Sequence, residues 1–326
     1  MPTIIYPRTL PWNWMTQRPQ QLLKELSYLG YTVFYEDRGD FPQPQIKKLW
    51  DSFYLCQGIS PLALSHPRPR LLWLTFPQHL HLIDTYQPDA VIFDCSDEAK
   101  EEFASWSPYI KPLLAQAKLV FASSQSLYEQ LAPQHPHVTL LRNGVDFAHF
   151  CTPQKRPLDL PTGKPLIGYS GAIAPWLDWE LLREVIRNHP QYHFVFIGAL
   201  VLLKRFPLEE ENVSYLGLKA YESLPGYLQA FHVSLIPFKL TAMTKGCNPI
   251  KLYEYAAAGL PTIGTPLPEL IRAQELIAGI SSRKSPQGQF QYCPGLTLVS
   301  NAQEFAQSLE EALQKSVDQE ALQTFA

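Results

Sequence analysis

The sequence lacks the features that place a protein in or across a membrane. No run approaches the 18 or so consecutive apolar residues of a membrane-spanning helix. The first 14 residues contain no basic segment followed by a long apolar run, so we expect no signal peptide. The five cysteines (Cys56, Cys95, Cys151, Cys247 and Cys293) are an odd number without a CxxC pair, which argues against a disulfide framework and a zinc site. These absences predict a cytoplasmic protein with free thiols.

Charge is also sparse. Charged residues make up 17% of the chain, and 27 Lys and Arg stand against 30 Asp and Glu. This balance argues against nucleic-acid binding, which depends on many contacts from Lys and Arg to phosphates. The nine histidines form no HExxH or other metal-ligand pattern. GxSxG and GxxxxGK[ST] are both missing, which argues against a serine hydrolase and a P-loop protein.

Proline is abundant, with 30 residues in a chain of 326, and this excludes one long helical bundle. The length favours two domains. In the first half, short apolar runs alternate with helical patterns, which is typical of βαβ units. We expect strands at 3–6, 31–35, 71–75, 90–94, 119–122 and 138–141, and helices at 18–29, 77–85, 98–105 and 125–131. Residues 38–70 read as irregular, with a short strand near 53–56.

A proline-rich stretch, 151–165, reads as a linker, and the alternation restarts after it. Here we expect strands at 166–169, 193–197, 213–216, 233–236, 262–264 and 296–299, and helices at 179–187, 222–231, 251–258 and 302–315. The fold class is therefore α/β, with two Rossmann-like doubly wound domains, 1–152 and 153–326, facing a central cleft. Ligands of such sheets bind beyond the carboxyl ends of the strands.

The most informative segment is 241–270. A polar loop with Lys245 and Asn248 leads into a helix that carries Lys251 and Glu254 on one face. A helix N-terminus and a Lys favour a diphosphate, and a carboxylate one turn later can accept both hydroxyls of a ribose. The alternative is an ordinary ion pair on a solvated helix. Tyr253, between them, is either a packing residue or a base-stacking residue.

A second candidate is the turn after the strand that begins at 166. Gly168 and Gly171 would let backbone N–H groups approach a phosphate at a helix start. A tight turn that simply needs small residues explains them equally well. Asp178 is either part of this site or the N-cap of the following helix.

Two further candidates lie in the first half. Asp97 follows the strand 90–94 and is either a catalytic base or a helix cap, whereas Asp94 belongs to the strand itself. In the first loop, Arg18 would face a ligand in the cleft. Trp12 and Trp14 could stack on sugar rings or pin the loop by packing.

These motifs resemble those of the group 1 (GT4-like), GT-B-fold glycosyltransferases, and most of all the teichuronic-acid and exopolysaccharide branch. The resemblance rests on WxxxxQRPQQL (12–22), FDCSDE (93–98), LRNGVDFAHF (141–150), GYSGAI (168–173) and PIKLYEYAAAGLPTIGT (249–265). It implies transfer of a sugar from a nucleotide diphosphate to a saccharide or lipid-linked acceptor, with no metal and no cofactor. Lys251 would lie near the donor phosphates, Glu254 on its ribose, and Arg18 and Asp97 near the acceptor.

The chain departs from the family pattern in three places. Gly246 stands where the family has a Glu, the loop after the strand at 166 has no Arg/Lys pair, and the family's last helix is missing after Phe325. Lys251, Lys245 and Arg18 are then left to carry the phosphate charge. A non-catalytic sugar- or nucleotide-binding protein is the alternative, and a nucleotide-sugar epimerase is a third reading. The run 199–206 is either a peripheral contact with the inner membrane face or a packed loop.

Overall fold

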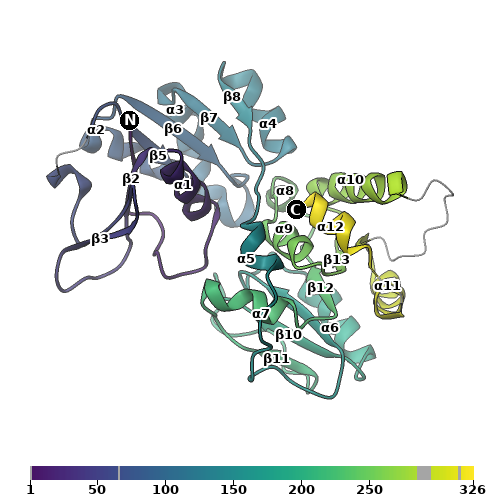
Figure 1. Cartoon of the computed structure of the whole chain (residues 1–326). Coiled ribbons are helices and arrows are strands. Elements are labelled where there is room, and N and C mark those ends of the chain that lie inside the picture. The colour runs from purple at the N-terminus through teal and green to yellow at the C-terminus, as the bar shows by residue number, and fades with distance from the viewer. Residues whose placement is uncertain (1, 65–66, 285–294, 315–316) are drawn as a thin grey trace. The chain divides into compact units, whose positions relative to one another are not determined.

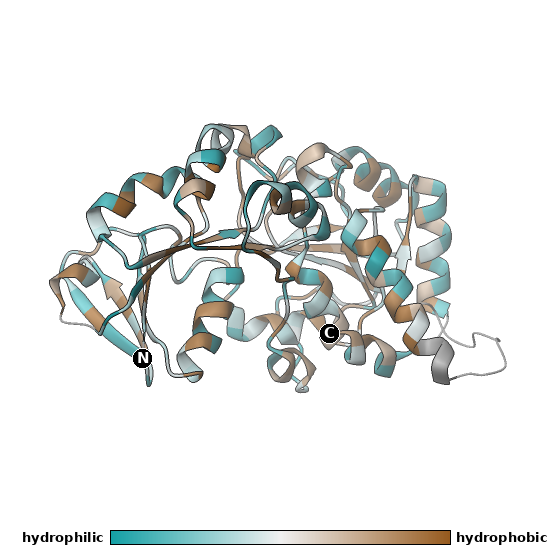
Figure 2. Cartoon of the chain, turned by 90° about the horizontal axis from the view of Figure 1, so that it is seen from above, coloured by the Kyte–Doolittle hydropathy of each residue, from teal (hydrophilic) through white to brown (hydrophobic). Residues whose placement is uncertain are grey.

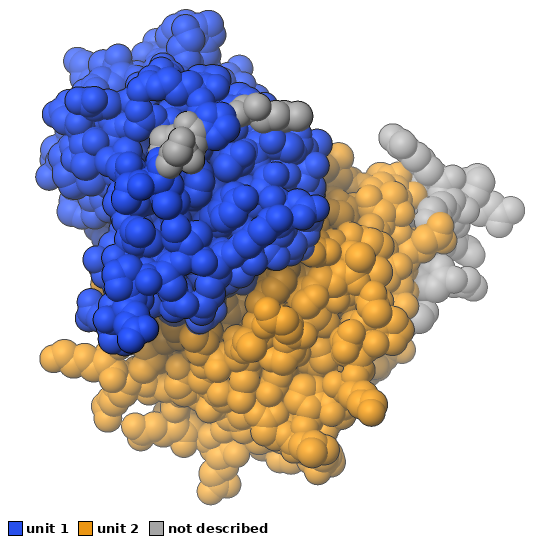
Figure 3. Space-filling model, turned by 60° about the vertical axis from the view of Figure 1, so that its left-hand side comes forward, with its two compact units in different colours: residues 1–142, 245–248 blue, residues 143–244, 249–326 orange. Residues whose placement is uncertain are grey.

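The computed structural model describes residues 2–64, 67–284, 295–314 and 317–326. The chain forms two compact units, coloured separately in Figure 3. Unit 1 contains residues 1–142 together with 245–248, and unit 2 contains residues 143–244 and 249–326. No helix in the described ranges is long and apolar enough to cross a membrane.

Unit 1 is built on an eight-stranded sheet of order β3-β4-β2-β1-β5-β6-β7-β8 (Figure 1). Only β3 runs antiparallel to its neighbour, and the other pairs are parallel. The strands are β1 (Thr3–Tyr6), β2 (Thr32–Glu36), β3 (Gln45–Trp50), β4 (Phe53–Gln57), β5 (Arg70–Leu74), β6 (Ala90–Cys95), β7 (Leu119–Ala122) and β8 (Val138–Leu140).

Helices cover both faces of this sheet, because successive strand residues point to opposite sides. Ile4 and Tyr6 pack with Leu23 of α1, whereas Ile5 packs with Leu113 and Leu127 of α3 and α4. The helical elements are η1 (Pro61–Ala63), η2 (Pro77–His81), η3 (Glu101–Trp106), η4 (Ala132–Gln134), α1 (Arg18–Tyr28), α2 (Leu82–Tyr86), α3 (Ser107–Gln116) and α4 (Gln125–Leu131).

Unit 2 has a six-stranded, fully parallel sheet of order β11-β10-β9-β12-β13-β14. Its strands are β9 (Leu166–Ser170), β10 (His193–Ile197), β11 (Val213–Tyr215), β12 (Val233–Ile236), β13 (Thr262–Gly264) and β14 (Leu296–Leu298). Its helical elements are α5 (Phe147–Cys151), α6 (Trp179–Asn188), η5 (Tyr221–Ser223), α7 (Leu224–Leu228), α8 (Ala242–Lys245), α9 (Ile250–Ala257), α10 (Pro268–Lys284), α11 (Ala302–Gln314) and α12 (Gln319–Phe325). The strands are mostly hydrophobic and the helices are striped (Figure 2), as parallel sheets covered on both faces require.

The expected parallel α/β architecture is confirmed, and five strands (β1, β7, β10, β12 and β13) have the bounds that the sequence predicts. The helix expected at 98–105 is wrong: a 3-10 turn, η3, occupies most of that stretch, and the α-helix α3 starts at Ser107, where Pro108 suits the first turn. Strand β3 and the helices α5, α8, α10 and α12 were not anticipated. Asp178 is the N-cap of α6, since its side chain accepts from the Leu181 N–H.

The proline-rich stretch after Cys151 has no regular secondary structure, as the sequence indicates. The sequence places the domain boundary after residue 152. In the structure, unit 2 already begins at Asn143, because α5 packs against α7 and α9. Cys56, Cys95, Cys151 and Cys247 form no disulfide within the described part of the chain, and Cys293 lies outside the described residues.

Candidate functional site

In unit 2 the first strand, β9, lies between β10 and β12, so the strand order reverses beside it. Ligands of doubly wound sheets bind at this reversal, beyond the carboxyl ends of the strands. Gly171 directly follows β9 and has φ +144°, which favours glycine. Its carbonyl oxygen would be 1.8 Å from a Cβ at Gly198, so glycine is required there as well.

Helix α9 brings Lys251 to this turn. The Lys251 Nζ lies 4.8 Å from the ring centroid of Phe238 and 5.4 Å from that of Tyr169. A Cβ at Gly171 would be 2.7 Å from Lys251 Cε, so the side chain packs directly against the bare backbone. The structure thus brings together two residues that the sequence assigns to the donor site, and an ammonium group lies beside the βα turn, where the Gly171 N–H already donates to the Ile197 carbonyl oxygen.

The position of α9 relative to β9 is fixed by Tyr255. Its hydroxyl accepts from the Ser170 N–H at 2.8 Å and lies 3.3 Å from the Ser170 carbonyl oxygen, to which it donates. Tyr255 is fully buried, and burial raises its pKa well above the usual range. It is therefore a neutral donor that holds the helix start, with Lys251, against the carboxyl end of β9.

Glu254 lies on the same helix and is 9% exposed. Burial raises the pKa of this carboxyl from 4.5 to about 7, and the charge of Lys251 opposes the rise. A buried carboxyl with a strongly perturbed pKa is a good candidate for a binding or catalytic group. This environment differs from the solvated ion pair that was the alternative reading.

The remaining predicted donor residues are more dispersed. Tyr253 is buried and stacks on Phe325 of α12, with ring centroids 5.5 Å apart, which favours packing over base stacking. Asn248 is also buried, and its Nδ2 donates to the Ser123 carbonyl oxygen within unit 1. Lys245 is exposed at the end of α8. Within unit 2, Lys251 therefore lies close to Gly171 and to Glu254, whereas Tyr253 packs on α12.

The sequence predicts that Arg18 faces a ligand, but in unit 1 its side chain is buried against the sheet. Arg18 is 4% exposed, and its Nε and Nη2 lie 2.9 Å from Oδ1 of the fully buried Asp94. Trp73 Nε1 also donates to this carboxylate, at 3.3 Å. A guanidinium buried on the sheet must be paired, and Asp94 supplies that partner. Arg18 thus joins α1 to β6, and the carboxylate of Asp94 balances its charge.

Asp97 lies in the loop after β6. The Ser96 hydroxyl donates to its Oδ2 at 2.8 Å. Burial raises the pKa of Asp97, while the Ser96 hydrogen bond and the charge of Arg18 oppose the rise. It does not begin a helix, because η3 starts at Glu101. A carboxylate of raised basicity at a strand end has the properties of a general base.

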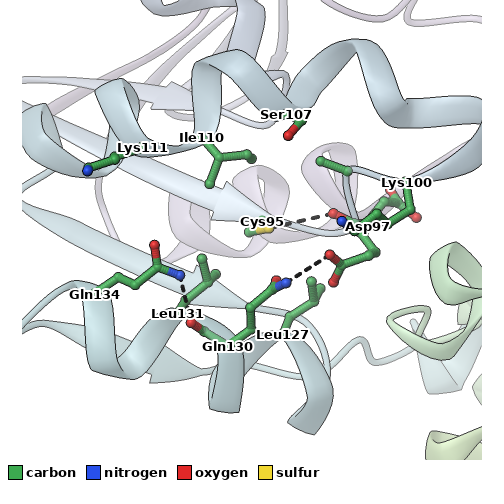
Figure 4. A pocket seen from close by; sticks show the side chains of 12 residues that line it. Cys95, Asp97, Lys100, Ser107, Ile110, Lys111, Leu127, Gln130, Leu131 and Gln134 are labelled. Carbon is green, nitrogen blue, oxygen red and sulfur yellow. Dashed lines mark hydrogen bonds between the residues drawn. The ribbon is translucent and has the colours of Figure 1, made fainter.

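A cavity of about 200 Å³ opens beside Asp97, between the loop 95–100, helix α3 and the segment α4–η4 (Figure 4). We call it the α3–α4 cavity. Cys95 and Asp97 line one part of it, and Ser107, Lys111, Gln130 and Gln134 come from the helices.

The first loop is pinned by aromatic packing. Trp12 lies 5.1 Å from Tyr35, 5.3 Å from Phe53 and 5.9 Å from Trp50, measured between ring centroids. Its backbone N–H donates to Asp37. Trp14 is half-buried, and its N–H lies within reach of the Pro11 carbonyl oxygen at 3.4 Å. Trp12 is therefore a packing residue that holds the loop, and Trp14 remains the candidate for stacking on a sugar ring.

Sequence reasoning missed three features of these sites: the aromatic support of Lys251, the Tyr255 hydrogen bonds and the α3–α4 cavity. The spacing of Lys251 and Tyr255 is four residues, which places them on one side of a helix and was a usable signal. No signal in the sequence pointed to Phe238, because its contact with Lys251 depends on how the sheet brings distant segments together.

Comparison with known proteins finds relatives for the C-terminal half of the chain and for the fold. Residues 164–315 match the family model "Glycosyl transferases group 1". Over 231 residues the chain is 26% identical to the Bacillus subtilis (strain 168) protein named "Putative teichuronic acid biosynthesis glycosyltransferase TuaH". That alignment covers 63% of this chain and 57% of the relative, so the chain spans little more than half of the relative's length.

Solved structures show the same fold. The sucrose-phosphate synthase of Thermosynechococcus elongatus superposes with a TM-score of 0.68 and 15% identity, over 99% of this chain and 92% of its own. Anabaena HepE, solved in complex with UDP-glucose, superposes with a TM-score of 0.61 and 13% identity, over 99% of this chain and 92% of its own. The expected GT-B fold class is thereby confirmed. The glycine turn after β9 and the α9 segment with Lys251 and Glu254 both fall inside residues 164–315, the part of the chain that matches the group 1 glycosyltransferase model.

Proposed function

We propose that the chain is a metal-independent glycosyltransferase. It transfers a sugar from a nucleotide-diphosphate donor to a saccharide or lipid-linked acceptor in cell-surface polysaccharide synthesis. The observation that carries this proposal is the close packing of Lys251 against Gly171 at the strand-order reversal of unit 2. A cation at the carboxyl end of the strand beside this reversal suits a diphosphate.

The chemistry follows from the placement of these groups. As the glycosidic bond breaks, negative charge develops on the leaving diphosphate, and Lys251 with the turn after β9 would stabilise it. Glu254, one turn further along α9, would accept the hydroxyls of the ribose. Asp97 of unit 1 would accept the proton of the acceptor hydroxyl if the reaction inverts the anomeric centre.

The relatives indicate which donors to try first. Anabaena HepE was solved with UDP-glucose, and the Bacillus relative is named for teichuronic acid biosynthesis. UDP-sugars are therefore the first donors to test, with acidic and neutral saccharides as acceptors. We also propose that the protein acts in the cytoplasm, and that the exposed Leu202 and Lys204 within 199–206 contact the inner membrane face.

The test is a calorimetric titration of UDP and GDP into the wild type, Lys251→Ala and Lys164→Ala. Lys164 is the matched control, because it precedes β9 at the opposite end of the strand from Gly171. Loss of a charge-assisted contact of about 1.5–3 kcal/mol lowers affinity by roughly 10- to 100-fold in Lys251→Ala. Equal affinity in all three proteins would overturn the donor site. Donor binding without turnover in the presence of chelator would favour the non-catalytic alternative.

A further inference from the structure

The two helices beside the α3–α4 cavity line it with both polar and apolar side chains. Ser107, Ile110 and Lys111 follow the i, i+3, i+4 spacing of one side of α3. The facing side of α4–η4 alternates in the same way, with Leu127, Gln130, Leu131 and Gln134.

Burial separates these residues into two groups. Leu127 and Leu131 are buried and Ile110 is half-buried, whereas the polar members of both faces are exposed. The cavity therefore has an apolar floor and a polar rim.

Hydrogen bonds orient the amides of this rim. Gln130 Nε2 donates to Glu98 Oε1 at 2.9 Å, and Gln134 Nε2 donates to the backbone carbonyl oxygen of Gln130 at 2.8 Å. Each amide then presents its carbonyl oxygen as an acceptor for a hydroxyl. A sugar ring has this complementary character, with apolar C–H groups on its faces and hydroxyls around its edge. The volume of about 200 Å³ is smaller than the 300 Å³ or so at which pockets for drug-sized ligands begin, so it suits one ring.

Charge gives the cavity a direction. Asp97 and Lys100 lie at one end, and Lys111 lies at the other end, on α3 (Figure 4). A ring with a hydroxyl at Asp97 would direct its opposite substituent toward the end of the cavity where Lys111 lies. An anionic substituent is favoured at that end, because Lys111 is the charged lining residue on α3. The other charged groups of the lining, Asp97, Glu98 and Lys100, belong to the loop after β6.

We infer that the α3–α4 cavity is the acceptor subsite for a single acidic sugar residue, with its reacting hydroxyl at Asp97 and its carboxylate at Lys111. This inference rests on the proposed glycosyltransferase function and adds the chemical class of the acceptor. Ile110 supports the ring face, and Gln130 and Gln134 receive its hydroxyls.

The test is a ligand-observed NMR titration of glucuronate, glucose and inorganic phosphate into the full chain. Glucuronate binds with a Kd of about 1 mM, a free energy of roughly −4 kcal/mol, and more tightly than glucose. Lys111→Gln weakens glucuronate about fivefold and leaves glucose unchanged. The control Lys118→Gln, at an exposed lysine outside the cavity, changes neither.

Two further variants keep the inference refutable. Ile110→Trp fills the floor and abolishes binding of both sugars, and Gln134→Ala, on the exposed rim, weakens both. Glucuronate affinity that survives in both variants overturns the subsite. Phosphate that binds as tightly as glucuronate and displaces it shows an anion site instead of a sugar site.

The same samples separate this inference from the function on which it rests. Nucleotide titration reports on Lys251, and glucuronate titration reports on Lys111, so each site is read independently. If UDP and GDP bind while glucuronate does not, only the acceptor subsite is wrong. If neither nucleotide binds, the glycosyltransferase proposal itself fails.

Discussion

Replacing Glu254 with glutamine tests the electrostatics of α9 directly. In the folded chain the pKa of Glu254 is raised from 4.5 to about 7, because the carboxyl is buried. The folded state therefore holds a proton that the unfolded state releases at lower pH. The contribution of Glu254 to stability is greatest below pH 4.5 and falls as the pH rises, until Glu254 ionises in both states above pH 7. The difference in pKa corresponds to about 3 kcal/mol of unfolding free energy across this window.

The assay is urea unfolding of the wild type, Glu254→Gln and Glu222→Gln between pH 4.5 and 8.5. Glutamine cannot ionise, so the stability of Glu254→Gln relative to the wild type rises by about 3 kcal/mol between the two ends of the range. The exposed Glu222, in η5 of the same unit, is the control and follows the wild type. Parallel curves for wild type and Glu254→Gln would refute the assigned environment of Glu254. The same ionisation makes nucleotide affinity rise more steeply with pH through about 7 in the wild type than in Glu254→Gln.

Three more predictions follow from contacts in the two units. Asp94→Asn leaves the buried Arg18 guanidinium without its counter-charge and lowers the unfolding free energy by about 3–5 kcal/mol in a urea melt; a loss below 1 kcal/mol would contradict a buried pair. Asp97→Asn lowers the transfer rate about 10²- to 10⁴-fold while calorimetry finds donor affinity unchanged, and an unimpaired rate would remove the proposed base. Gly198→Ala places a Cβ 1.8 Å from the Gly171 carbonyl oxygen, so it lowers the thermal midpoint and nucleotide affinity together; an unaltered midpoint would contradict the close approach.

Local sequence patterns were sufficient for the parallel sheets. The buried strands of both units are short apolar runs between turn residues, so β1, β7 and β10 could be located from the sequence. Helix α3 was misplaced, and it contains two prolines, a residue type that usually disfavours a helix interior. Pro108 occupies the first turn of the observed helix, and Pro112 lies inside it. Strand β3 was missed because Lys47 and Lys48 interrupt its apolar pattern on an exposed edge.

The candidate sites were predictable only in part. The spacing of Lys251 and Glu254 was visible in the sequence, and the helix that carries them formed as expected. The raised pKa of Glu254 and the aromatic rings under Lys251 arise from tertiary packing, which no local pattern specifies. Arg18 shows the opposite case: its place at a helix start suggested a ligand, but its partner Asp94 lies 76 residues away in the sequence.

The ion pair of Arg18 and Asp94 also has a consequence for how relatives of this chain can diverge. Loss of either charge alone leaves the other buried without compensation, whereas loss of both in favour of apolar side chains is tolerated. The two positions should therefore change together during descent. Relatives with a neutral residue at the position of Arg18 should have one at the position of Asp94, despite the long separation in sequence. A collection of relatives in which the two positions vary independently would show that the pair is dispensable.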